Sequence, residues 1–188
     1  MSKWLLSIVA ILVPVMAPAV AAPPRASPPP TTTLRSKDGT IEVALPPGWE
    51  EALEGSPMRK AVAQPDAKIV ARKTGTPSFA IAFRNAKEDY TAKTLEEFAA
   101  KTVEVEAKKI ADRTVSAPRK LLLGGKQAIQ YEIQHDRSGV VLIYRETFTE
   151  SAKHWVQIRC MTTPSHRKEL DEDCMAIGAS LRELPPAK

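Results

Sequence analysis

Alternation of apolar and polar residues dominates the chain beyond residue 40. A period of two is typical of strands that bury one face, and turn residues separate these segments from one another. Residues 126–135 show the pattern most clearly, because Ile129, Tyr131 and Ile133 alternate there with polar side chains. The predicted strands are 40–45, 68–73, 78–85, 119–123, 126–135, 140–149 and 154–161, together with 58–64.

Two segments follow the helical period of 3.6 residues instead. The first, 94–112, opens with Thr94 and Glu97, the residue pair of a capping box. The second, 164–182, has Pro164 in its first turn. Its apolar stripe consists of Leu170, Cys174, Ile177 and Leu181. Because strand runs are interrupted by two helices without βαβ alternation, we predict an α+β sandwich.

The N-terminus has the pattern of a secretory signal peptide over residues 1–21. Lys3 provides the positive start, and an apolar run follows it. Ala19 and Ala21 then place small residues at the two positions that a signal peptidase reads. We expect cleavage between Ala21 and Ala22, since a cut one residue later would leave a proline directly after it.

An uncleaved membrane anchor is the alternative interpretation of this segment. A membrane span needs about 20 predominantly apolar residues, whereas Pro14 and Pro18 interrupt the run. We therefore expect a periplasmic or secreted protein that contacts the membrane only through its signal peptide, before cleavage.

A proline-rich stretch, residues 22–33, follows the predicted cleavage point. It contains five prolines and no large apolar side chain, so we expect an extended spacer. A docking ligand for a partner is the alternative role. The predicted domain then covers 34–183, and 184–188 form a C-terminal tail.

The composition narrows the class of protein without naming a function. With 188 residues, 43% hydrophobic and 26% charged, wholesale disorder and a multi-span membrane protein are both excluded. The net charge of +5 is a small excess spread among acidic residues, so we expect no nucleic-acid partner.

One stretch is more basic, and it is a candidate surface for an acidic partner or anionic head groups. Its residues are Arg59, Lys60, Lys68, Arg72 and Lys73. The alternative is a solvated sheet edge, where lysines oppose aggregation.

The two cysteines, Cys160 and Cys174, are predicted to form a structural disulfide. Strand alternation puts Cys160 on the same face as Ile158, and Cys174 belongs to the apolar stripe of the last helix. Both therefore point into one interface, and an exported chain meets an oxidising compartment. Two buried, unbridged thiols are the alternative.

No residue pattern for catalysis or for a cofactor emerges. The three histidines, His135, His154 and His166, stand at element ends without the spacing of metal ligands. We identify no catalytic, cofactor-binding or metal-binding residue and expect no cofactor.

The layout of short apolar signatures resembles the PsbP-like superfamily. The strand and Pro-Gly-Trp corner of 41–51 come first, and the helix 94–110 follows. The segment LLLGGKQAIQYEI (121–133) and the terminal helix ending in IGASLRE (177–183) complete the likeness. This superfamily includes photosystem II extrinsic subunits, a yeast Ran-binding import factor and bacterial exported proteins similar to DcrB. The resemblance implies an α-β-α sandwich around a central antiparallel sheet and a role in binding or assembly, although a shared fold does not transfer function.

The leading hypothesis is a non-enzymatic binding or assembly accessory of the bacterial envelope, whose partner is an unidentified protein or envelope component. An enzyme with residues dispersed along the chain and a purely structural envelope protein are the alternatives. A concave pocket with converging titratable groups would favour an enzyme. An exposed apolar patch would favour partner binding.

We predict that the mature protein begins at Ala22, because Ala19 and Ala21 follow a short apolar run. N-terminal sequencing of periplasmic or secreted material checks this. A full-length, membrane-bound product would contradict it.

Overall fold

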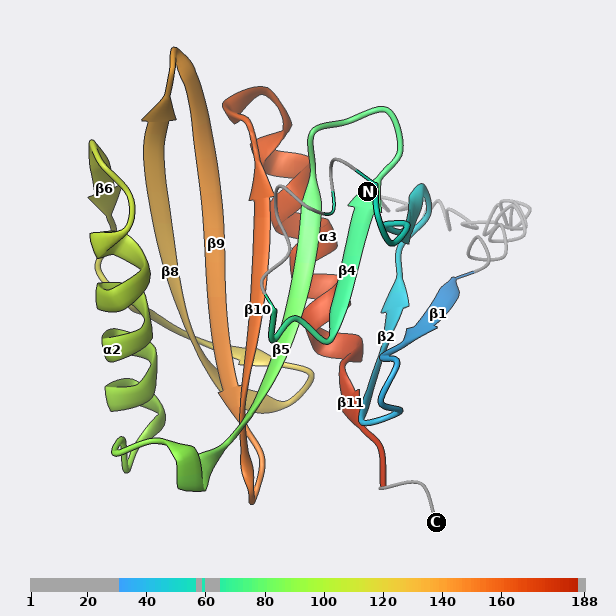
Figure 1. Ribbon diagram of the computed structural model, residues 1–188, viewed down its shortest axis with the longest axis vertical. Helices are drawn as coiled ribbons and strands as arrows, with labels where there is room; N and C mark the ends of the chain where they lie inside the picture. Colours follow the sequence, from blue (N-terminus) through green and yellow to red (C-terminus); the bar gives the residue numbers. More distant parts are fainter. Residues whose placement is uncertain (1–30, 57–58, 60–64, 186–188) are drawn as a thin grey trace, which may run out of the picture.

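The computed structural model describes residues 31–56, 59 and 65–185. An eight-stranded antiparallel sheet forms its centre (Figure 1). Along the sheet the strands run β3 (Trp49–Glu51), β4 (Ile69–Lys73), β5 (Phe79–Ala86), β10 (His154–Thr162), β9 (Val140–Glu150), β8 (Lys126–Arg137) and β6 (Arg113–Val115), and β7 (Arg119–Leu123) also pairs with β8. The predicted strands over 68–73, 78–85, 119–123, 126–135, 140–149 and 154–161 are confirmed to within a few residues at their ends.

Tight turns join neighbouring strands and explain the antiparallel order. The turn from β7 to β8 is Gly124-Gly125, and both residues have positive φ, 57° and 82°. A two-residue hairpin turn of this kind requires positive φ at both positions, which glycine adopts without strain. Gly124 is required for a second reason, because a Cβ there would lie 2.6 Å from the carbonyl oxygen of Ala179.

Two helices pack on opposite faces of the sheet, α2 (Leu95–Lys108), at the left of Figure 1, and α3 (Arg167–Ser180), behind the strands in that view. On the α2 side the core consists of Leu95, Phe98, Ala99, Val103, Ile129, Tyr131, Ile133, Phe148 and Trp155. On the α3 side Ile158, Cys160, Leu170, Cys174 and Ile177 pack together with strand β2 (Ile41–Leu45). The predicted α+β sandwich with a central antiparallel sheet is confirmed.

The start of α2 follows the predicted capping pattern with one difference. The Thr94 side chain accepts a hydrogen bond from the backbone N–H of Glu97 at 3.1 Å. The Glu97 carboxylate accepts from the backbone N–H of Lys93 at 2.7 Å, one residue earlier than a capping box requires. The helix ends at Lys108, four residues before the predicted end at 112.

A small second sheet extends the α3 layer and contains residues from both ends of the described chain. Its strands are β1 (Thr32–Arg35), β2 and β11 (Arg182–Glu183). Thr32 and Thr33 pair with β2, so the domain includes the last two residues of the predicted spacer.

The C-terminal helix ends at Ser180 rather than 182, because its last residues are held by β2. The backbone N–H of Ala44 donates to Ser180 Oγ at 2.9 Å, and Leu181 is already extended. Leu184, the first residue of the predicted tail, donates from its backbone to the carbonyl oxygen of Thr40 at 2.8 Å. The paired backbone therefore extends one residue past the predicted domain end.

The predicted signal peptide, its cleavage site between Ala21 and Ala22, and most of the spacer lie outside the described residues. So do Lys60 and nearly all of the predicted strand 58–64. Within the described part of the chain, no helix has both the length and the apolar character to span a membrane.

The predicted disulfide between Cys160 and Cys174 is present and joins β10 to α3. The two Cα atoms lie 6.2 Å apart, within the range that a disulfide spans. Both residues are almost completely buried, at 0% and 3% exposed, so the bond lies inside the core of the α3 side.

Replacing Cys160 with Ser is predicted to lower the free energy of unfolding by about 3 kcal/mol, because the bond closes a loop of about 15 residues in the unfolded chain. Cys160→Ser combined with Cys174→Ser should cost little more than either change alone, since each removes the same bond. Urea unfolding of the three variants measures this. Additive losses, or two free thiols in the non-reduced protein by mass spectrometry, would contradict it.

Candidate functional site

A cavity of about 340 Å³ opens on the α2 side of the sheet. It lies between α2, the short 3-10 helix η1 (Lys87–Asp89) with the residues after it, and the segment before β4. We call it the α2 groove. Its apolar wall is Tyr90, Phe98 and Val105, and its polar lining includes Asp66, Asn85, Asp89, Lys101, Glu106 and Gln157.

Tyr90 stands on a fixed aromatic stack at the mouth of the groove. Its ring meets Phe98 edge to face, with centroids 5.0 Å apart, and Phe98 stacks on Trp155 at 5.1 Å. The backbone N–H of Lys87 donates to the carbonyl oxygen of Lys153 at 2.9 Å and attaches η1 to the turn between β9 and β10. Tyr90 is nevertheless 38% exposed, so a rigid aromatic surface faces solvent.

Two carboxylates lie close to Tyr90 without a partner of their own. Among the residues that the structure describes, Asp66 and Asp89 make no ion pair and no side-chain hydrogen bond. Partial burial and the negative charges of Asp66 and Asp89 raise the pKa of the Tyr90 hydroxyl. The phenol therefore stays protonated, and the two negative charges face the groove uncompensated.

A buried charge network lies beneath the groove and consists of Glu106, Glu146, Gln157 and Arg159. Glu146 is 2% exposed and accepts from Arg159 Nε and, at 2.8 Å, from Gln157 Nε2. The Arg159 guanidinium also lies 3.3 Å from Glu106 Oε2 on α2. The network thus joins β9, β10 and α2 through charged groups.

The charge of Arg159 is retained despite its burial. Burial alone would lower the pKa of Arg159, but the charges of Glu146 and Glu106 outweigh this effect and raise it. The guanidinium also lies over the ring of Phe83, 5.6 Å from its centroid. Removing one member of such a pair leaves a buried charge without compensation, which is strongly destabilising.

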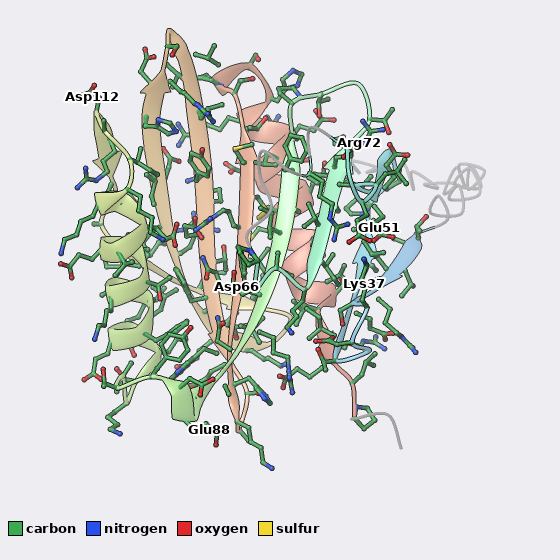
Figure 2. All side chains as sticks on the ribbon, viewed as in Figure 1. Lys37, Glu51, Asp66, Arg72, Glu88 and Asp112 are labelled. Atoms are coloured by element: carbon green, nitrogen blue, oxygen red, sulfur yellow. A yellow bond between two sulfur atoms is a disulfide. The ribbon has the colours of Figure 1, made fainter. Side chains whose placement is uncertain are left out.

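Of the basic residues predicted as a partner surface, the four that the structure describes are paired with carboxylates. Arg59 lies 3.6 Å from Glu51, and Lys68 lies 2.7 Å from Asp38. Arg72 pairs with Glu50, and Lys73 pairs with Asp173 and Glu169. Figure 2 shows Arg72 and Glu51 near the edge of the sheet that is farther from α2. These pairs offset much of the positive charge that the linear stretch indicated.

The histidines are also engaged with neighbouring side chains. His135 stacks on Tyr144, and His154 lies 3.0 Å from Glu183. His166 lies 3.8 Å from Glu169. Within the described residues, no group of three or more His, Cys, Asp or Glu side chains could hold a metal ion.

Sequence analysis did not identify the residues of the α2 groove. One signal was present for the network, because Glu146 lies between Tyr144 and Phe148 on one face of its strand. Gln157 and Arg159 follow Trp155 and precede Met161 on one face of theirs. For Asp66 and Tyr90 no local pattern exists, since they meet only when the segment before β4 lies beside η1.

A second cavity, of about 530 Å³, lies on the α3 side next to the turn at Gly124. Its carboxylates already have partners: Glu150 pairs with Lys87, and Glu183 pairs with Arg84 and His154. The α2 groove is therefore the stronger candidate, because its carboxylates are available to a ligand.

No protein-family model and no curated protein sequence matches the chain. Solved structures match its fold. Cyanobacterial PsbP from Synechocystis sp. PCC 6803 is 12% identical, with a TM-score of 0.57 over 89% of this chain and all of that one. LpqN, involved in cell envelope biogenesis of Mycobacterium tuberculosis, is 15% identical, with a TM-score of 0.53 over 83% of this chain and 91% of that one. The Ran-binding protein Mog1p of Saccharomyces cerevisiae is 8% identical, with a TM-score of 0.50 over 81% of this chain and 95% of that one. The PsbP-like fold indicated by the sequence is confirmed, and at these identities the likeness concerns the fold alone.

Glu146→Gln is predicted to lower the free energy of unfolding by about 3 kcal/mol, because it leaves the buried Arg159 short of a counter-charge. Glu104→Gln serves as the control, since Glu104 forms an exposed pair with Lys108 and its loss should leave the unfolding midpoint unchanged. Urea unfolding compares the two. Equal midpoints for both variants would show that the buried network does not stabilise the fold.

Proposed function

Because the chain has the PsbP-like fold, we propose that it is an exported, non-enzymatic binding or assembly accessory of the bacterial envelope, with the α2 groove as its binding site. The comparison structures support a role of this kind, since one is a Ran-binding protein and another is involved in cell envelope biogenesis. The signal-peptide pattern and the disulfide between Cys160 and Cys174 support export to an oxidising compartment.

The observation that carries the proposal is that the groove combines two carboxylates without a described partner with exposed aromatic and apolar side chains. Asp66 and Asp89 have no partner within the described part of the chain, whereas the basic residues near β4 are paired. Tyr90 and Val105 are 38% and 46% exposed at the rim. Aromatic and apolar surface beside unpaired charge is typical of a binding site.

Binding fits the groove better than catalysis does. A general base or nucleophile needs a pKa close to the working pH. Burial and the neighbouring carboxylates move the pKa of Tyr90 upward, away from neutrality. Glu106 in the lining is engaged by Arg159. The described lining therefore presents groups suited to holding a ligand rather than to transferring a proton.

Site-specific photo-crosslinking in the producing cells tests the proposal. A benzoyl-phenylalanine at Val105 of the full-length chain lies at the rim of the groove and is expected to give discrete adducts. The matched control is Val140, which is equally exposed at 50% but lies at the β8–β9 turn, away from the groove.

Adducts at Val105 that are absent at Val140, and that decrease when Tyr90→Ala is added, would support the groove as the binding site. No adduct at Val105, or the same adducts at both positions, would contradict it.

A further inference from the structure

The charge and surface of the α2 groove indicate what kind of partner it binds. Three carboxylates belong to its described lining, and one of them, Glu106, pairs with Arg159 and Lys109, whereas Asp66 and Asp89 form no ion pair with a described residue. Lys101 Nζ is bound to Thr91 Oγ1 at 3.2 Å and makes no ion pair with Asp66 or Asp89. Asp66 and Asp89 therefore carry negative charge in the groove that no ion pair with a described side chain offsets.

The aromatic wall of the groove also favours a positively charged ligand. Tyr90 is held edge to face against Phe98 and keeps more than a third of its surface exposed. A cation over an aromatic face is attracted by the negative face of the ring. Asp66 and Asp89 lie close enough to this ring for their charge to act on its hydroxyl. A bound cation would thus meet an aromatic surface and two carboxylates together.

The size and rim of the groove favour a side chain over a large cofactor or a free ion. A volume of about 340 Å³ is at the lower end of ligand pockets, which span about 300–1,000 Å³. Val105 and Tyr90 are exposed at the rim, where they would contact the surface around an inserted side chain. A small free cation would leave that apolar rim uncovered.

We propose that the α2 groove binds a lysine or arginine side chain of a protein partner. Asp66 and Asp89 supply the countercharge, and Tyr90 provides the surface on which the aliphatic stem and the charged head lie. This inference rests on the proposed function, because it names the chemistry of the partner that the same groove would bind.

An NMR titration of the chain from residue 22 to 188 tests whether the groove recognises the positive charge of a side chain. The probe is the peptide acetyl-Gly-Arg-Gly-amide, and its matched control replaces arginine with citrulline, which has the same shape without the charge. We expect the arginine peptide to shift the amide signals of Tyr90, Lys101 and Val105 with about tenfold higher affinity than the citrulline peptide, since two carboxylates and one aromatic face each contribute modestly. The lysine peptide is expected to behave like the arginine peptide.

Two double variants distinguish the effect of the carboxylates in the groove from the effect of the protein's net charge. Asp66→Asn with Asp89→Asn should lower the affinity for the arginine peptide about tenfold and abolish its advantage over citrulline. Glu104→Gln with Asp112→Asn changes the net charge by the same amount but lies outside the groove lining, so it should leave the affinity unchanged (Asp66 and Asp112 are labelled in Figure 2). The amide spectrum of each variant verifies its fold.

Equal affinity for the arginine and citrulline peptides, or no shifts with either, would overturn this inference. If crosslinks at Val105 persisted in that case, the groove would still be a binding site, but for a partner of different chemistry. If the crosslinks were absent too, the proposed function would fail with it.

Discussion

Strand β10 is the element on which every layer of this domain depends. It lies at the centre of the sheet between β5 and β9, and it is buried along most of its length on both faces. Because side chains alternate along a strand, neighbouring residues act on opposite layers. Cys160 forms the disulfide that attaches α3 behind the sheet. Arg159, one residue earlier, reaches Glu146 on β9 and Glu106 on α2 in front of it.

The two faces of β10 hold their helices by different interactions, apolar and covalent on the α3 face and charged on the α2 face. On its α3 face β10 presents the apolar side chains of Val156 and Ile158, and Cys160 adds a covalent link to α3, so the packing there tolerates little change in side-chain volume. On the α2 face a charged group is buried and must be satisfied by partners in defined positions. This requirement places Glu106 and Gln157 at the base of the α2 groove. The same contacts that hold α2 therefore also shape the polar side of the candidate site.

The ion pairs of the folded chain change how much of its linear charge pattern is available to a partner. The basic stretch before and along β4 was a candidate surface for an acidic partner, and its described members pair with carboxylates from β3, α3 and the turn between β1 and β2. Lys73, for example, meets Asp173, which is 100 residues away in the chain. Among the lining residues of the α2 groove that the structure describes, Asp66 and Asp89 form no such pair, which is why we propose an acidic and aromatic binding surface there.

The sequence by itself determined the two helices, most of the longer strands and one long-range bond of this protein. Strand alternation, the helical stripes and the Gly-Gly turn are local patterns, because they follow from backbone geometry over a few residues. The disulfide was predictable as well, since Cys160 and Cys174 each occupy an apolar position of an adjacent element. Tertiary structure alone decided the helix end at Ser180, which depends on a hydrogen bond from β2. It also decided the site, because whether a charge is paired or free depends on which distant segments meet, and no local pattern records that.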